Sequence, residues 1–318
     1  MCRVAVSGLA GLLLTLGAQM APAQAQMART FVSSVNGNDA NDCGRLTPCR
    51  TFQAAHDKTF PDGEITVLDP GGYGAVTIGK SISIVNDGVG EAGVLVSGGA
   101  VGIEVAAANA FVNLRGITVQ GIGFGGGTGL RLDNAFALTL TNCVIRNHTG
   151  NGIDYRPNFG GSLAVSNSLM ADNGGSGISV QPFGANPVTV TLTRVEMYNN
   201  SHDGFTINTQ AATGAINGTV TDSVAANNFQ AGFATRGASP GGATVGAVLV
   251  TRSVSSNNRF GFLTENGSAQ DFVVGESIVT LNALGAASPS VRTYGDNYSY
   301  FNSGTNDLVP THVFEQKQ

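Results

Sequence analysis

Residues 187–208 read PVTVTLTRVEMYNNSHDGFTIN, and this stretch contains three short strand patterns separated by turns. Residues 189–193 alternate threonine with apolar residues, which is typical of a half-buried strand. A second strand ends at a pair of asparagines, and Asp203-Gly204 then turns the chain into a third strand at 205–207. Three strands and three turns predict one coil of a parallel β-solenoid, in which each strand pairs with its equivalent in the next coil.

The same pattern returns about every 27 residues, a period that indicates a solenoid. The copies align on an anchor residue that opens the second strand: Gly116, Cys143, Ser168, Val195, Ser223, Ser253 and Ser277. Five positions after the anchor stand His148, Asn173, Asn200, Asn228, Asn258 and Asn282. Asparagine tolerates the left-handed backbone conformation and hydrogen bonds well at turns. We therefore expect these residues to adopt that conformation and to form a structural ladder along the solenoid.

The repeats resemble those of right-handed parallel β-helix proteins of the pectin-lyase-like superfamily. The segment FVSSVNGNDANDCGRLTPCRTFQAAHD at 31–57 is similar to the entry strand, loop and capping helix of exported members. The resemblance implies an all-β, right-handed parallel β-helix of about nine rungs with a short N-terminal capping helix, N-capped near Thr51. An inward column containing Phe205, Phe233 and Phe262 is expected to stack inside it. The fold hosts lyases, hydrolases, epimerases and non-catalytic proteins, so it does not decide function.

The expected organisation has four parts. Residues 1–25 combine a positive start, an apolar run and Ala23-Gln24-Ala25, which predicts a signal peptide and export to the periplasm or beyond. Residues 26–62 would form the strand, disulfide loop and capping helix, 63–302 the β-helix, and 303–318 a C-terminal tail or cap. No later apolar run is long enough to span a membrane.

The charge and cysteine content of the chain limit which partners and which cell compartment are expected. The chain has 16 Lys and Arg against 21 Asp and Glu, a net charge of −5, and no basic block, which argues against nucleic acid. Cys43 and Cys49 bracket a short loop and are expected to form a disulfide in an oxidising compartment. Cys143 occupies an anchor position and is expected to be a buried thiol. The oligomeric state remains open.

Candidate catalytic residues are few. The expected outer face of the first strand offers hydroxyl and methyl groups instead of the titratable pairs that acid–base catalysis needs. Arg131 and Asp154 fall at equivalent outward positions of successive third strands, with Arg156 and His148 close in sequence. A lyase could use such a set, but a cross-rung ion pair between Arg131 and Asp154 explains them equally well. His148 also reads as a substitute for asparagine in its column.

Two further sets could bind ligands. The oxygen-rich run at 36–42 contains Asp39 and Asp42 and could contribute to a Ca²⁺ site, although an Asx-rich turn explains it too. On the first-strand face, Thr139, Thr191 and Thr219 form a regular array of hydroxyl groups that could contact a ligand.

Three hypotheses follow. The first is an exported, non-catalytic β-helix that contacts carbohydrate or a cell-surface glycan along one face. The second is a polysaccharide lyase, hydrolase or epimerase with a non-standard site, and the third is a structural or adhesive surface protein. Two apolar stripes on the second strand, one through Val144 and one through Ile145, compete for the core, and the sequence leaves the choice open.

Overall fold

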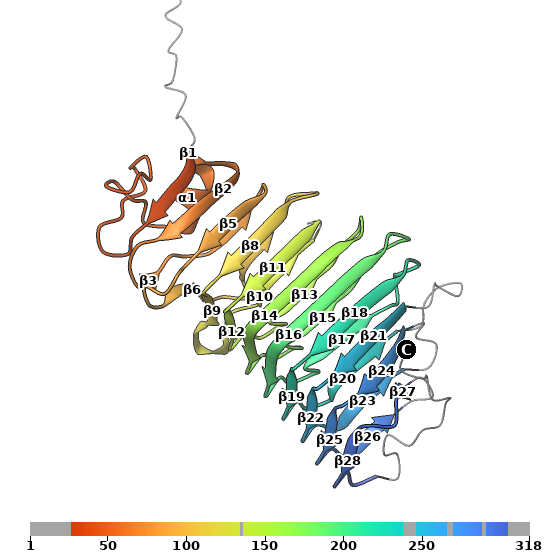
Figure 1. The fold of residues 1–318 in the computed structure, drawn as a ribbon. Helices are drawn as coiled ribbons and strands as arrows, with labels where there is room; N and C mark the ends of the chain where they lie inside the picture. Colours follow the sequence, from red (N-terminus) through yellow and green to blue (C-terminus); the bar gives the residue numbers. More distant parts are fainter. Residues whose placement is uncertain (1–26, 134–135, 238–245, 266–269, 288–290, 305–318) are drawn as a thin grey trace, which may run out of the picture.

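A computed structural model describes residues 27–133, 136–237, 246–265, 270–287 and 291–304. The chain winds into a right-handed parallel β-helix whose coils stack along one axis (Figure 1). The predicted fold class is confirmed. The predicted signal peptide at 1–25 and the residues of the predicted C-terminal cap from 305 onward lie outside the described residues.

Three strands make each coil. The first-sheet strands are β2 (Thr59–Val67), β5 (Ile82–Val85), β8 (Phe111–Arg115), β11 (Ala137–Thr141), β14 (Gly161–Ala171), β16 (Val188–Tyr198), β18 (Ile216–Thr221), β21 (Gly246–Thr251), β24 (Gln270–Gly275) and β27 (Val291–Thr293). The second-sheet strands are β3 (Gly71–Gly72), β6 (Ala92–Val96), β9 (Ile117–Gly121), β12 (Val144–Arg146), the second halves of β14 and β16, β19 (Val224–Ala226), β22 (Val254–Ser256), β25 (Ile278–Thr280) and β28 (Tyr298–Tyr300). Because β14 and β16 run through the corner, these two sheets are joined into one of 19 strands.

The third sheet contains nine strands among the described residues. They are β4 (Val76–Ile78), β7 (Val101–Val105), β10 (Thr128–Leu132), β13 (Ile153–Tyr155), β15 (Ile178–Val180), β17 (Phe205–Asn208), β20 (Ala231–Arg236), β23 (Phe260–Thr264) and β26 (Leu284–Ala287). The solenoid itself has about seven regular turns, those from β8 to β26, slightly fewer than the nine rungs expected from the sequence. The 3₁₀ helix η1 (Ile122–Phe124) interrupts the corner after β9.

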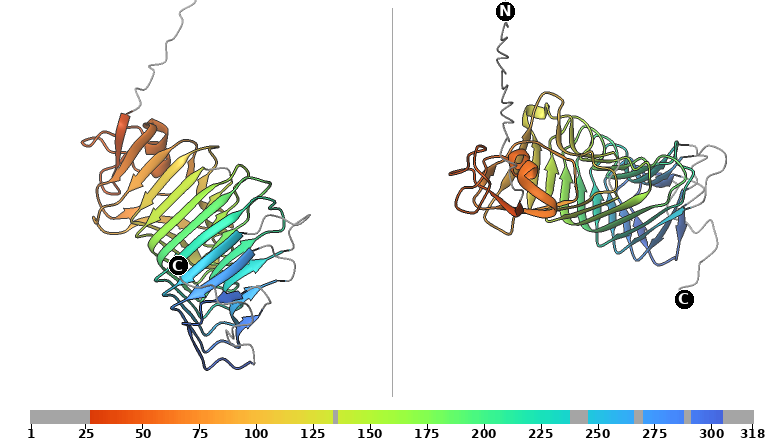
Figure 2. Two further views of the ribbon diagram at one scale, coloured as in Figure 1. Left: turned by 45° about the vertical axis from the view of Figure 1, so that its right-hand side comes forward. Right: turned by 90° about the horizontal axis from the view of Figure 1, so that it is seen from above.

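The N-terminal end of the solenoid is covered, as Figure 2 shows in two further views. Strand β1 (Met27–Val32) pairs in parallel with β2, and α1 (Phe52–Lys58) packs against β1, β2 and β4. The Thr51 side chain accepts a hydrogen bond from Ala54 N at 3.2 Å, which satisfies one free amide of the first helical turn. Phe52 is buried at this end and confirms the short capping helix.

The asparagine ladder runs through the second turn. Side-chain amides donate to the next carbonyl oxygen at 3.0 Å (Asn173 to Asn200), 2.9 Å (Asn200 to Asn228), 3.1 Å (Asn228 to Asn258), 3.1 Å (Asn258 to Asn282) and 3.1 Å (Asn282 to Asn302). Asn302 extends the ladder one step beyond the sequence prediction. The expected backbone conformation was wrong, because the left-handed residue is the one before each ladder position, such as Asn199 (φ 55°) and Asn227 (φ 58°).

The pairing register of β9 and β12 shows that Gly116 was wrongly assigned as the first anchor residue. Thr118 pairs with Val144, so Ile117 and not Gly116 is the equivalent of Cys143. Gly116, at φ 68°, instead occupies the left-handed corner that Asn142 fills at φ 56°. Glycine fits there because it lacks the Cβ atom that strains this conformation.

The core is apolar and continuous, and it settles the choice between the two second-strand stripes. Ile145, Met170 and Met197 are fully buried, whereas the stripe through Val144 points outward and is half-exposed. In the third sheet Phe233 stacks on Phe262 with ring centroids 5.1 Å apart. Phe205 is buried and lies in register with Phe233.

Candidate functional site

A polar array covers the outer face of the first sheet. Side chains alternate along a strand, so every second residue points away from the core. One outward column runs in register through Ser83, Asn113, Thr139, Ala164, Thr191, Thr219 and Leu249. Adjacent members lie on strands about 4.8 Å apart, so their hydroxyl and amide groups form a closely spaced row. Thr139, Thr191 and Thr219, the predicted binding residues, therefore share one column.

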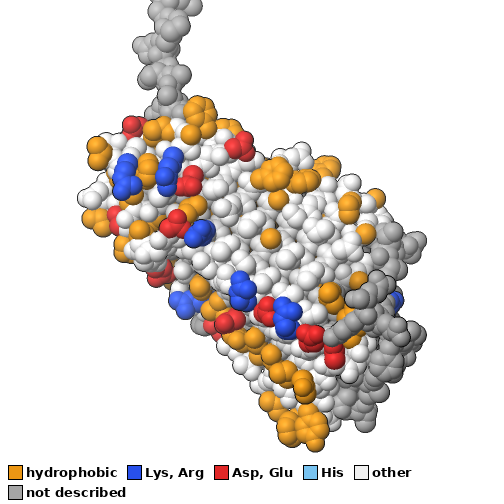
Figure 3. Space-filling view, viewed as in Figure 1, with side chains coloured by type: hydrophobic (Ala, Val, Ile, Leu, Met, Phe, Trp, Pro, Cys, Tyr) orange, Lys and Arg blue, Asp and Glu red, His pale blue; other side chains and the backbone are white. Residues whose placement is uncertain are grey.

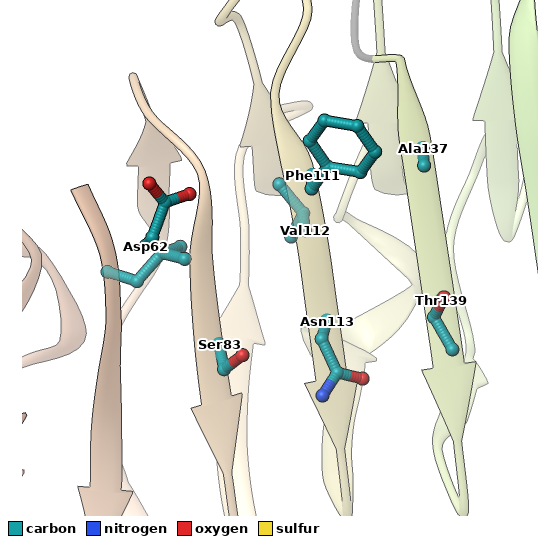
Figure 4. A pocket seen from close by; sticks show the side chains of 8 residues that line it. Asp62, Ser83, Phe111, Val112, Asn113, Ala137 and Thr139 are labelled. Atoms are coloured by element: carbon teal, nitrogen blue, oxygen red, sulfur yellow. The ribbon is translucent and has the colours of Figure 1, made fainter.

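A groove opens at the N-terminal part of this face, with a volume of about 230 Å³ (Figure 4). It is lined by Asp62, Ile82, Ser83, Phe111, Val112, Asn113, Ala137 and Thr139. Figure 4 shows the Phe111 ring next to Ala137, with the Asn113 amide and the Thr139 hydroxyl further along strands β8 and β11. Thr139 therefore belongs to the groove, whereas Thr191 and Thr219 continue its column further along the face.

Two exposed aromatic rings form the apolar part of the site. The Phe111 and Phe136 centroids are 5.2 Å apart with the rings tilted by 53°. Phe111 is 58% exposed and Phe136 is 46% exposed, although residues of this type are normally buried. The Phe111 backbone N–H donates to Ser81 Oγ at 3.1 Å, which fixes the start of β8. The sequence analysis did not identify these two rings or Asp62, Ser83 and Asn113, because the strand register that brings them together is not visible in the residue types.

Three ion pairs lie near the ends and borders of this face. Arg29 contacts Glu64 at 2.9 Å, Arg115 contacts Asp87 at 2.9 Å, and Arg292 contacts Asp271 at 2.7 Å. Figure 3 shows the middle of the broad front face as mostly uncharged, with basic and acidic side chains gathered at the N-terminal end and along one border.

The predicted catalytic set lies on the third sheet. Arg131 and Asp154 are in register, but the expected ion pair between them is wrong. Arg131 Nη2 instead contacts Glu104 Oε1 at 2.5 Å on the preceding coil, and this hydrogen bond raises the pKa of Arg131. Asp154 is only 2% exposed, pairs with Arg156, and accepts from Gln181 Nε2 at 3.3 Å. Each group is therefore engaged with another protein group.

His148 has the surroundings of a ladder residue. Its backbone N–H donates to Asn173 Oδ1 at 3.3 Å, and its ring Nε2 lies 3.3 Å from Val119 O. Its Nδ1 is buried and has no hydrogen-bond partner in the described part of the chain. Burial lowers the pKa of the imidazole and outweighs the opposing effect of the Val119 carbonyl. His148 lies in the turn between β12 and β13, at the start of the ladder.

The acidic loop uses its oxygens internally. Asp39 Oδ1 accepts from Arg50 N at 2.8 Å and Thr51 N at 2.9 Å, while Asp42 Oδ1 accepts from Thr47 Oγ1 at 2.5 Å. The Lys58 ammonium donates to Asp39 O at 2.6 Å, so a protein cation already lies in this loop. Within the described ranges no group of three or more His, Cys, Asp and Glu side chains is placed to hold a metal ion.

The described cysteines form one disulfide in the N-terminal loop and one free thiol in the core. Cys43 and Cys49 form the predicted disulfide. Cys143 is a buried free thiol, and burial raises its pKa to about 11. No helix in the described part of the chain has the length and apolarity needed to cross a membrane.

Comparison with known proteins agrees with this architecture. The family model described as "Right handed beta helix region" matches residues 101–284. Among solved structures, the pectate lyase Pel9A superposes with a TM-score of 0.55 at 17% identity, over 85% of this chain and 81% of its own. The A-module of mannuronan C-5 epimerase AlgE4 from Azotobacter vinelandii gives 0.52 at 17% identity, over 74% and 67%. ORF18 of Geobacillus virus E2 gives 0.51 at 14%, over 77% and 52%. A sequence comparison with curated proteins gives no match.

Proposed function

The chain belongs to the right-handed β-helix family, and on that premise we propose that it is an exported, non-catalytic protein that binds a polysaccharide along the outer face of its first sheet. The observation that carries the proposal is the exposed Phe111–Phe136 pair at one end of a column made mostly of hydroxyl and amide groups. A sugar ring presents an apolar C–H face and a rim of hydroxyl groups. An aromatic ring suits the face, and Asn113 and Thr139 suit the hydroxyl groups.

The length of the site supports a polymeric ligand. From β8 to β21 the column crosses five strand spacings, which is roughly 24 Å at 4.8 Å per spacing. Polar side chains occupy most of this distance, with Ala164 as the break and Leu249 at the end. Pel9A and AlgE4, which share the fold, are named for actions on pectate and mannuronan, and this makes a polysaccharide the ligand class to test first.

The side chains on the face support binding without catalysis. Glycoside hydrolysis by acid–base chemistry generally uses two carboxyl groups on either side of the scissile bond. In the groove Asp62 is the single carboxylate among the lining residues, and the other polar side chains there are Ser83, Asn113 and Thr139. The arginines of the third sheet are held in ion pairs. These features support a receptor surface.

Export is supported by the Cys43–Cys49 disulfide, since such bonds persist in oxidising compartments. The apolar N-terminal segment predicted to be a signal peptide agrees with this.

Calorimetry and a glycan panel test the proposal on purified residues 26–318. Phe111→Ala is expected to weaken glycan affinity at least tenfold, about 1.4 kcal/mol. Phe229→Ala is the matched control, because this ring is 73% exposed at the second turn, away from the groove. Equal losses in both variants, or absence of binding by folded protein, would contradict the proposal. Release of unsaturated or reducing products by the wild type would favour an enzyme instead.

A further inference from the structure

We infer that the ligand is an uncharged polysaccharide, and that the face discriminates against polyuronates. The inference rests on the proposed function and adds the charge class of the ligand. It runs against the names of the structural neighbours, since pectate and mannuronan are both polyuronates.

The middle of the face carries no ionic group. The outward residues of the first-sheet parts of β11, β14, β16, β18 and β21 are hydroxyl, amide or apolar: Ala137, Thr139, Thr141, Ser162, Ala164, Ser166, Thr189, Thr191, Thr193, Asn217, Thr219, Thr221, Ala247, Leu249 and Thr251. A polyuronate places a carboxylate on every sugar. Along these strands each carboxylate would lose hydration without gaining a cation.

The arginines at the borders of this region are held by protein groups, and for four of them the partner is a carboxylate. Arg29, Arg115 and Arg292 each contact a carboxylate at 2.7 to 2.9 Å. On the border between the first and second sheets, Arg252 Nε contacts Asp222 Oδ1 at 2.8 Å, and this hydrogen bond raises the pKa of Arg252. Beside it, Arg194 Nε donates to Asn167 Oδ1 at 2.6 Å. A polyuronate would have to compete with these partners for every arginine.

The groove adds repulsion. Asp62 is exposed on β2 at the N-terminal edge of the groove, separated from Phe111 by strand β5 (Figure 4). A ligand carboxylate close to it would be repelled, and the repulsion would be stronger where water is displaced. A neutral sugar meets no such cost. Its hydroxyl groups can donate to Asp62 and exchange hydrogen bonds with Asn113 and Thr139.

The test compares hexasaccharides of matched length by calorimetry at 20 mM and 150 mM salt, with and without Ca²⁺. The neutral probes are β-glucan, xylan and glucomannan hexamers, and the acidic probes are oligogalacturonate and oligomannuronate. The wild type is expected to bind at least one neutral probe at least tenfold more tightly than either acidic probe. Thr139→Lys is expected to raise affinity for the acidic probes at 20 mM salt, and this gain should shrink at 150 mM because salt screens exposed charges.

Thr139→Gln is the matched control, since it lengthens the side chain without adding charge. Acidic probes binding as tightly as neutral ones, or Thr139→Lys and Thr139→Gln behaving alike toward acidic probes, would overturn the inference. The first of these results would leave glycan binding standing. Binding of no probe by protein with a cooperative unfolding transition would overturn the proposed function itself.

Discussion

Replacing Asn228 with alanine would interrupt the buried asparagine ladder near its centre. Four hydrogen bonds end on this side chain. Its Nδ2 donates to Met197 O at 3.0 Å and to Asn258 Oδ1 at 3.1 Å. Its Oδ1 accepts from the backbone N of Asn200 at 3.1 Å and from the Asn200 side-chain amide at 2.9 Å. The side chain lies in the interior, where water does not replace these partners readily.

After this substitution the neighbouring ladder residues, Asn200 and Asn258, lose different hydrogen bonds. The Asn200 side-chain amide keeps its bond to Met170 O at 3.2 Å, and Asn258 Oδ1 keeps the bond from Asn228 N at 2.9 Å. The backbone N–H of Asn200 loses its acceptor. An orphaned buried donor costs about 1–3 kcal/mol and each of the other lost bonds about 1 kcal/mol. With three other bonds lost, the free energy of unfolding is therefore expected to fall by about 4–6 kcal/mol.

Urea unfolding followed by far-ultraviolet circular dichroism measures this change. Asn217→Ala is the matched control, because Asn217 is exposed on β18 and a surface substitution of this kind is expected to stay within about 0.5 kcal/mol. A loss below about 1 kcal/mol for Asn228→Ala would refute the reasoning, since the ladder would then contribute little to stability.

Three further predictions concern the loop, the core and the pH response. Removing the disulfide with Cys43→Ser and Cys49→Ser should lower the unfolding free energy by about 2 kcal/mol, measured in urea against the oxidised protein. Phe233→Ala should cost about 3–5 kcal/mol because it empties the stack on Phe262, whereas Phe229→Ala should leave the urea midpoint nearly unchanged. Burial lowers the pKa of His148. Below about pH 6.5 the unfolded chain therefore takes up a proton that the folded chain does not, and the free energy of unfolding decreases as the pH is lowered. His148→Asn should reduce the drop in urea midpoint between pH 7.5 and 5.5, and an unchanged drop would contradict this role.

The fold was predictable from the sequence because each strand pairs only with its equivalent one coil away, which makes the repeat visible as a period. The ladder column was visible for the same reason. The left-handed conformation was assigned one residue too late because Asn199-Asn200, Asn227-Asn228 and Asn257-Asn258 are identical pairs. In each pair the first residue turns the backbone and the second points its amide along the axis, a difference of role that the residue type does not encode.

The candidate site was only partly predictable. The threonine column follows from alternation within strands, so Thr139 was found. Phe111 and Phe136 are 25 residues apart in sequence, and they meet because β8 and β11 pair with Phe111 opposite Ala137. The partners of Arg131 also depend on register, since Glu104 and Asp154 lie on opposite sides of it and geometry selects Glu104.

The left-handed corner before the second strand has a consequence for how the length of this molecule can change. Asn142, Asn167 and Arg194 occupy this corner in successive coils with φ values of 56°, 49° and 53°. Excision of residues 168–194 would join Asn167 to Val195 with the same backbone geometry and would bring His148 to Asn200 in the ladder. A whole coil is thus a unit that can be removed or added, so recombination between copies can shorten or lengthen the outer face of the first sheet by one strand while both ends keep their own contacts.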